Sequence, residues 1–179
     1  DRSGRTPTPA ARGRVEAEQK IAERSRSNYR ITPEDQIGVG NARQKVLANL
    51  EAIKVLKTIQ DENRMATPAE KAVLVKYVGW GAFAQDMFAT HKPEWKAQRD
   101  MLRSLISQEE YEAARASTLN AHFTSPDVVR GMWDALMHMG YKGGQAIEPA
   151  AGVGHFIGMI PDKVAPKTAW TAVELDPLT

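Results

Sequence analysis

The sequence contains no cysteine, which excludes disulfides, thiolate metal sites and cysteine nucleophiles. It also lacks an apolar run near the roughly 20 residues that a membrane-spanning helix needs, and its first residues show no apolar core of a signal peptide. A strong overall charge is missing too, since the formal net charge is +2. We therefore expect a protein of the cytoplasm with no membrane partner.

What the sequence does contain is enough apolar material for a core. Its 179 residues are 42% hydrophobic and 26% charged, which suits one ordinary domain or a domain with a helical extension. The basic excess is placed unevenly. Residues 1–30 hold eight Lys/Arg against four Asp/Glu, a charge of +4, so the remainder carries −2.

Residues 1–27 form this basic arm. Residues 1–14 contain no large apolar side chain, so we expect them to be disordered, because burial cannot offset the entropy of ordering them. Residues 15–26 favour a short, charged helix. The arm could touch nucleic acid phosphates or serve as a solubilising tail or interdomain linker, and we favour the tail or linker.

Residues 28–118 are predicted to form an α-helical module. Its first part, 27–40, favours an extended segment, since a proline and two glycines interrupt any helix there. From Asn41 to about Asp61, apolar side chains recur at three- and four-residue steps, which is typical of one buried helix face. These side chains are Val46, Leu47, Leu50, Ile53, Leu56 and Ile59.

Capping boxes and glycines divide the rest of this module. The TPAE box at Thr67 opens a helix that should stop at Gly79, and the box at Ser107 opens another that runs to about residue 116. A further helix is expected over 93–106. The GWGAF segment, 79–83, could present a surface to a ligand or form a tight corner between helices, and we favour the corner.

The next segment, Phe123-Thr124-Ser125-Pro126, is a polar and aromatic loop that leads into a helix. Ser125 is a favourable N-cap, Pro126 a favourable first residue, and Asp127 adds a favourable charge to the first turn. Gly140 should end this helix. Its apolar contacts should come from Val128, Val129, Met132, Leu136 and Met139.

A strand, a glycine-rich turn and a helix should follow, over 145–148, 149–154 and from His155 onward. Gly152 and Gly154 let the main chain bend sharply and approach a ligand, and the first N–H groups of the helix lie behind them. A second strand is expected over 168–174. It ends in Glu174, and a carboxylate at this tip of an open α/β sheet holds ribose hydroxyls.

The glycine pattern leaves two cofactor classes open. Gly152, Gly154 and Gly158 give GxGxxxG, and Glu174 lies 20 residues beyond the second glycine. This spacing fits a nicotinamide dinucleotide as well as S-adenosylmethionine. Three features favour S-adenosylmethionine: the Glu-Pro pair at 148–149, the Asp-Pro pair that follows the carboxylate, and the FTSP loop about 25 residues upstream.

Together these segments resemble the adenine-N6 DNA methyltransferases. Residues 123–126 look like their FxTP-type motif, residues 148–156 like their D/E-P-x-x-G-x-G-x-F motif, and residues 173–177 like their acidic second-strand motif. The order of the motifs matches the gamma arrangement. The NYRITPEDQIGVGNARQKV and VKYVGWGAF stretches are further similar to large phage and plasmid proteins, among them anti-restriction proteins, that join this methylase to a helicase-like region.

The resemblance implies an α/β fold and a set of partners. A helical N-terminal module would be followed, over 119–179, by the beginning of a class I (Rossmann-like) S-adenosylmethionine-dependent methyltransferase sheet. The implied cofactor is S-adenosylmethionine. The implied partners are DNA, in the intact protein, and the remainder of the same polypeptide, with a helicase-like region as one candidate. The implied location is the cytoplasm of a bacterial host cell or a phage-associated setting.

The implied cofactor site has two ends. Phe123, Thr124 and Pro126 would line the methionine end, with Glu148 facing the amino group of the methionine or holding the loop. At the other end, Glu174 would accept hydrogen bonds from both ribose hydroxyls. The other residues implied at the cofactor are Pro149, Ala150, Gly152, Gly154, Phe156 and Leu175.

Simpler interpretations stand beside some of these roles. Phe156 would pack beside the cofactor or belong to the core alone, whereas Leu175 would flank the adenine. Asp176 favours a turn before proline over a ligand contact. His155 is expected on the solvent side of its helix, and nothing near it indicates metal ligation, so we expect no metal site.

One motif of the family is missing. Methyl transfer to an adenine amino group uses an Asn/Asp-Pro-Pro-Tyr/Phe motif, but the sequence contains no Pro-Pro pair. Two strands also leave sheet edges open, so we expect a fragment of a longer polypeptide, without a catalytic residue and inactive alone. A hypothesis of another class stays open: the arm and residues 41–116 bind DNA or a protein, and the glycine loop is vestigial.

Overall fold

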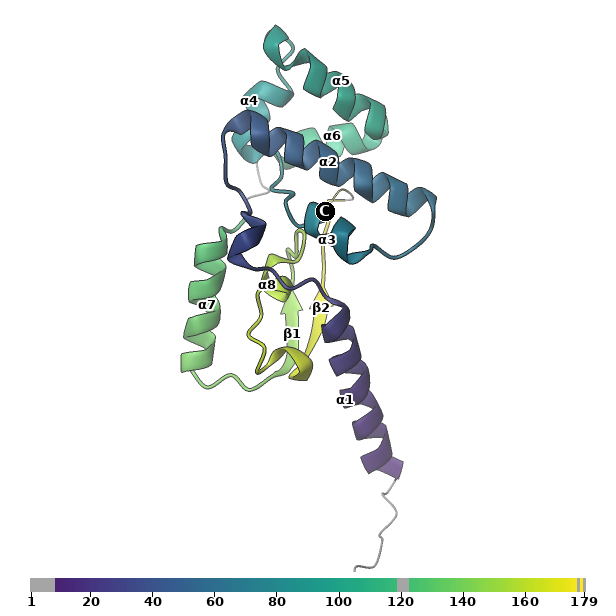
Figure 1. Cartoon of the computed structure of the whole chain (residues 1–179), viewed down its shortest axis with the longest axis vertical. Coiled ribbons are helices and arrows are strands. Elements are labelled where there is room, and N and C mark those ends of the chain that lie inside the picture. Colours follow the sequence, from purple (N-terminus) through teal and green to yellow (C-terminus); the bar gives the residue numbers. More distant parts are fainter. Residues whose placement is uncertain (1–8, 119–122, 177, 179) are drawn as a thin grey trace, which may run out of the picture.

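The computed structural model describes residues 9–118, 123–176 and 178. It is a mixed α/β structure in which helices dominate and two short strands form a small parallel sheet. Figure 1 shows the helices of the middle of the chain at one end of the long axis, and the strands with two flanking helices towards the other. None of the described helices is both long and apolar enough to cross a membrane.

The basic arm is more helical than its composition predicts. Helix α1 spans Pro9–Ser27, so the expected disorder is wrong for residues 9–14, and residues 1–8 lie outside the described part of the chain. Proline is favourable at a first helical position, and the two alanines that follow it are the best helix formers. Helix α1 also packs against β2 (Thr168–Ala172) and the 3-10 turn η4 (Ala165–Lys167), which adds tertiary support.

The helical module is built around α2. This helix spans Ala42–Asp61, and its N-cap, Asn41, accepts a hydrogen bond from the Gln44 N–H. The predicted helix is therefore confirmed, although Leu47 on its predicted apolar face is exposed. The other elements of the module are η1 (Pro33–Asp35), α3 (Pro68–Leu74), η2 (Gly81–Phe83), α4 (Ala84–Met87), η3 (Pro93–Trp95), α5 (Lys96–Leu105) and α6 (Gln108–Ser117).

The capping boxes at Thr67 and Ser107 are confirmed, because both side chains accept the backbone N–H three residues later. The predicted end of the α3 helix at Gly79 is wrong, since α3 stops at Leu74. The fully buried Asn49 accounts for the difference. Its amide accepts the Val78 N–H (2.9 Å) and donates to the Gly79 carbonyl (2.6 Å), so it holds the chain in a non-helical path.

The side chains of the GWGAF corner pack into the core of the module. Trp80 is fully buried and Phe83 nearly so, together with Leu50, Met87 and Leu102. This is the corner that we favoured over a ligand-presenting surface. The two interpretations are not exclusive, however, because η2 also borders a cavity described below.

The sheet is small and parallel. Strand β1 (Gly144–Glu148) pairs with β2, with Gly144 opposite Thr168 and Glu148 opposite Ala172. Both predicted strands are present, although β1 begins one residue earlier than predicted and β2 ends two residues earlier. The helix between them, α8, is limited to His155–Gly158, shorter than the helix expected from residue 155 onward. Pro161, which lacks the N–H that a longer helix would need, follows three residues beyond its end, and the Gly158 carbonyl accepts the Ile31 N–H (3.0 Å).

Helix α7 (Pro126–His138) covers one side of the sheet, with Ser125 as its N-cap as predicted. Val129 and Trp133 are buried in a second core cluster, which also contains Ile160 and Val164. The expectation that all five apolar side chains of this helix make core contacts is wrong. Val128, Met132, Leu136 and Met139 are exposed, because the described residues provide no layer against that flank.

The core of the helical module extends into the strand region. Leu178, which follows β2, is buried among the side chains of the module, and Phe123 and Val153 pack against the same cluster. Residues 29–31 add contacts on the other side of α8, where Ile31 lies against Gly158. The boundary near residue 118 is thus crossed by packing at several places.

Candidate functional site

The acid at the end of the second strand lies against the glycine bend that follows the first strand. The Gly152 N–H donates to a Glu174 carboxylate oxygen at 2.7 Å. The backbone brings the two segments together, because the Val173 N–H donates to the Glu148 carbonyl and the Ala151 N–H donates to the Val173 carbonyl. The parallel pairing of the strands therefore continues into the bend and the acidic segment.

Glu174 is exposed, yet three backbone donors surround its carboxylate. The other oxygen accepts the N–H groups of Leu175 (2.7 Å) and Asp176 (2.9 Å). Partial burial raises the pKa of Glu174, but the hydrogen bonds from these two residues and Gly152 outweigh it, so the pKa is lowered overall. The carboxylate is therefore ionised and held in place at neutral pH.

The bend has a left-handed backbone at both of its glycines. Gly152 has a φ of 52° and Gly154 a φ of 79°, which side chains with a Cβ rarely adopt. The two glycines differ in their surroundings. A Cβ on Gly154 would meet nothing within 4 Å, whereas a Cβ on Gly152 would lie 3.2 Å from the Phe123 ring. Only Gly154 thus faces open space.

Phe123 is clamped between two glycines from distant parts of the sequence. A Cβ on Gly79 would lie 2.5 Å from the ring, on the side away from Gly152. The ring also makes edge contacts with Tyr77 (5.7 Å between centroids) and His155 (6.1 Å). It therefore packs the FTSP segment, the corner of the helical module and the glycine bend together.

A cavity of about 300 Å³ opens beside this ring, and we call it the Phe123 cavity. The four FTSP residues and His155 form one wall, and the other wall comes from the helical module. Three sequence-predicted site residues, Phe123, Thr124 and Pro126, thus border one cavity. The residues of the helical module in the other wall include Ile37, Lys45, Val78 and Phe83.

His155 lies inside the protein, so its predicted position on the solvent side is wrong. It is 5% exposed, and its Nε2 lies 3.2 Å from the Val75 carbonyl oxygen. Burial lowers the pKa of His155, and hydrogen bonding with backbone groups of Val75 and Thr124 opposes this shift only in part. The ring is therefore neutral at pH 7 and tethers α8 to the end of α3.

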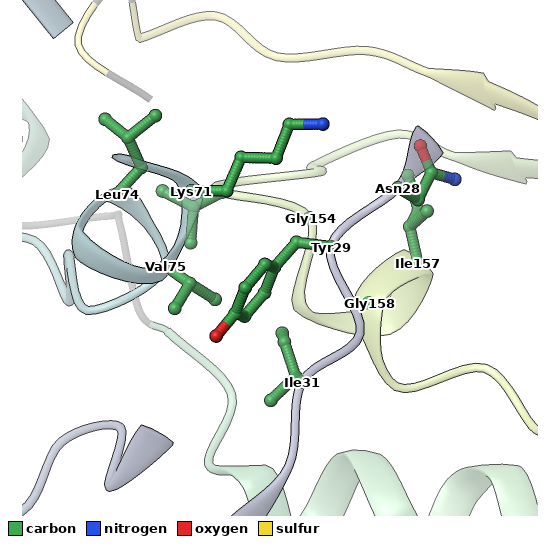
Figure 2. Close-up of a pocket in the computed structure, with 10 residues that line it drawn as sticks. Asn28, Tyr29, Ile31, Lys71, Leu74, Val75, Gly154, Ile157 and Gly158 are labelled. Carbon is green, nitrogen blue, oxygen red and sulfur yellow. The ribbon is translucent and has the colours of Figure 1, made fainter. Parts of the chain in front are cut away.

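A second cavity, of about 240 Å³, lies on another side of the bend, and we call it the Tyr29 cavity. Figure 2 shows Lys71 and Leu74 of α3, and Val75 directly after it, facing Ile157 of α8, with Tyr29 between them. The Lys71 side chain in the wall of this cavity already has a partner, because its Nζ donates to the Ser27 carbonyl (2.6 Å). Gly154 also borders it.

The other predicted site residues lie around these features. Pro149 and Ala150 are exposed at the start of the bend, and Leu175 is 97% exposed beside the carboxylate. Glu148 is partly buried, and the described structure records a bond only from its backbone. Phe156 packs on the second core cluster and borders neither cavity, as its interpretation as a core residue predicts.

Three residues shape the site in ways that the sequence analysis did not predict. Asn49 fixes the corner, Gly79 makes room for Phe123, and Lys45 borders the Phe123 cavity. A polar residue among the apolar positions of a helix, as at position 49, is a usable signal. The other two contacts join segments far apart in the chain, and local patterns do not indicate them.

Among the described residues, no group of three or more His, Asp or Glu side chains could hold a metal ion. Comparisons of the chain with protein-family models, curated proteins and solved structures find no match. The fold class therefore stands, from the structure, as a mixed α/β arrangement with a small parallel sheet.

Proposed function

We propose that this chain binds S-adenosylmethionine and forms the cofactor-binding part of a DNA methyltransferase of the adenine-N6 type, on a class I Rossmann-like sheet. One observation carries the proposal: the Glu174 carboxylate lies 2.7 Å from the Gly152 backbone nitrogen. The bend after the first strand and the acid after the second therefore share one sheet edge. Open α/β sheets bind nucleosides at this edge.

The residues at this edge suit an adenosine. Each carboxylate oxygen has two lone pairs, and three of these four accept the backbone N–H groups of Gly152, Leu175 and Asp176. Glu174 can therefore accept one ribose hydroxyl while it keeps all its bonds to the backbone. The exposed Leu175 offers an apolar surface to a base. Gly154, two residues beyond the bonded Gly152, borders the Tyr29 cavity and has no heavy atom within 4 Å of an added Cβ apart from its chain neighbours. These residues fit the nucleoside half of S-adenosylmethionine without a change of the fold.

The geometry favours the methyl donor over a nicotinamide dinucleotide. A dinucleotide site uses the N-terminus of a helix of several turns to bind the pyrophosphate. Helix α8 has only four residues, so its dipole is small. The FTSP segment, by contrast, lies against the bend through Phe123, which supports the sulfonium-bearing ligand implied by the motif order.

Titration calorimetry of the 179-residue chain with S-adenosylhomocysteine tests this proposal. We expect weak but saturable binding, which Glu174→Gln should reduce by roughly tenfold or more, because a charged hydrogen-bond acceptor for the ribose is lost. Glu51→Gln, an exposed acid on α2, is the matched control and should bind normally. Absence of binding, preference for a nicotinamide dinucleotide, or DNA binding unaffected by Glu174→Gln and without any methyl-donor binding would each contradict the proposal.

The same chain should transfer no methyl group to DNA by itself. Its sequence contains no Pro-Pro pair, and the Asn/Asp-Pro-Pro-Tyr/Phe motif would be needed to hold a flipped adenine. Incubation with DNA and S-adenosylmethionine labelled on the methyl group measures this directly. We expect no label above background in the DNA, and DNA would act as a partner only in the intact protein.

A further inference from the structure

The described residues that border the Phe123 cavity carry a net positive charge. Among the described residues that border it, Lys45 is the one formal charge at neutral pH, and none is acidic. The hydroxyls of Thr124 and Ser125 add hydrogen-bonding groups. Much of the remaining wall is apolar, with Phe83, Phe123 and Pro126 among its members. Such a wall suits a ligand with a short apolar body and an anionic end.

Lys45 differs from the paired cations of the helical module. Lys57 bonds to Glu110, Lys92 lies 2.7 Å from Asp86, and Lys96 bonds to Asp100. In the part of the chain that the structure describes, no carboxylate pairs with Lys45, although this residue is partly buried in the first turn of α2. A partly buried cation beside a cavity attracts an anion more strongly than an exposed one, because solvent screens it less.

We propose that Lys45 binds the carboxylate of the amino-acid end of the methyl donor in the Phe123 cavity. This inference rests on the proposed function and adds to it: the helical module supplies the counter-charge of the cofactor. The module would therefore be part of the binding site.

The contacts of Phe123 indicate how the ribose end and the carboxylate end of the methyl donor would lie. Its ring borders the cavity and also lies against Gly152, whose N–H is bonded to Glu174. A ligand with its ribose at Glu174 and its carboxylate at Lys45 would therefore have to pass this ring. The sulfur of the methyl donor lies between its ribose and its carboxylate, so the ring would lie near the reacting methyl group.

Two ligands that differ in the carboxylate test the assignment. S-adenosylhomocysteine carries the amino-acid end, whereas methylthioadenosine carries the same nucleoside without it. Calorimetry should show that Lys45→Met lowers the affinity for S-adenosylhomocysteine by roughly tenfold, the effect of one charge-assisted hydrogen bond. The affinity for methylthioadenosine should be unchanged. Lys45→Arg keeps the charge and should restore most of the lost affinity.

Lys54→Met is the matched control, because Lys54 is exposed on the same helix, and circular dichroism checks that each variant is folded. Equal loss of both ligands in Lys45→Met, or no loss of either, would overturn the role of Lys45 while the methyl-donor site stands. If neither ligand binds the unaltered chain, the proposed function itself is wrong, and this inference is overturned with it.

Discussion

The helical module and the strand region differ in how completely they are packed. The module encloses side chains such as Leu50, Trp80, Met87 and Leu102, which are fully buried. The strand region has a smaller cluster around Trp133 and leaves several large apolar side chains in solvent. Those side chains include Met132, Leu136, Ile147, Val173 and Leu175.

This difference shows which part of the molecule holds the candidate site in place. The glycine bend belongs to the strand region, which is less completely packed. However, Phe123, Val153 and Leu178 pack it onto the core of the module. His155 adds a polar tether to the end of α3. The module therefore stabilises the bend, and changes in the module should be felt at the site.

The largest effect should come from the core of the module. Leu50→Ala removes a fully buried side chain and should lower the free energy of unfolding by roughly 2–5 kcal/mol. The same substitution at the exposed Leu175 should change it by less than about 0.5 kcal/mol. Urea denaturation measures both. Similar losses in the two variants would mean that the comparison between the regions is wrong.

The buried amide of Asn49 should come next. Asn49→Ala leaves the Val78 N–H and the Gly79 carbonyl without their side-chain partner, which should cost about 2–4 kcal/mol. Asn41→Ala removes a helix cap on the exposed end of the same helix and should cost about 1 kcal/mol. The ranking of these two denaturation midpoints checks the prediction, and the reverse ranking would contradict it.

A smaller effect should follow from crowding at the Phe123 ring. Gly79→Ala would place a Cβ 2.5 Å from the ring at a φ of 68°, and should cost about 1–3 kcal/mol. Gly140→Ala has a comparable backbone strain, at a φ of 89°, but nothing within 4 Å. It should cost about 1 kcal/mol. Hydrogen exchange should show faster opening of residues 152–155 in the first variant alone.

The mildest effect should be the pH response of His155. Its pKa is lowered in the folded protein, so the unfolded chain binds the proton more readily. The stability that follows from this shift is complete above the unfolded pKa, near 6.5, and is lost as the pH falls below it. His155→Gln should flatten the fall in thermal stability between pH 7 and 5. An unchanged slope would show that the ring is not held neutral.

The sequence predicts the starts of helices better than their ends. Thr67, Ser107 and Ser125 carry their capping bonds as predicted, because a cap depends on four neighbouring residues. The end of α3 depends instead on Asn49, which approaches from elsewhere in the chain. Helix α8 ends three residues before Pro161, and its last carbonyl accepts the Ile31 N–H. A proline and a polar residue on an apolar helix face are local signals, but neither indicates which distant segment it will contact.

The candidate site, like the helices, was predicted only in part. Strand positions and glycines indicated that the bend and Glu174 would lie together at one edge, and the structure places them in contact. The same pattern placed His155 on the solvent side, but the Phe123 ring and the end of α3 cover it. The contribution of Lys45 to the wall of the Phe123 cavity likewise depends on how the module docks.

Nuclear magnetic resonance of the backbone amides tests the central claim most directly. Titration of the 179-residue chain with S-adenosylhomocysteine should shift the amide signals of Gly152, Gly154 and Leu175 saturably, because the ligand would share the Glu174 carboxylate with these segments. The amide of Gly140, at the far end of α7, should stay in place. Unmoved signals of Gly152 and Gly154, or an equally large shift of the Gly140 signal, would contradict the account.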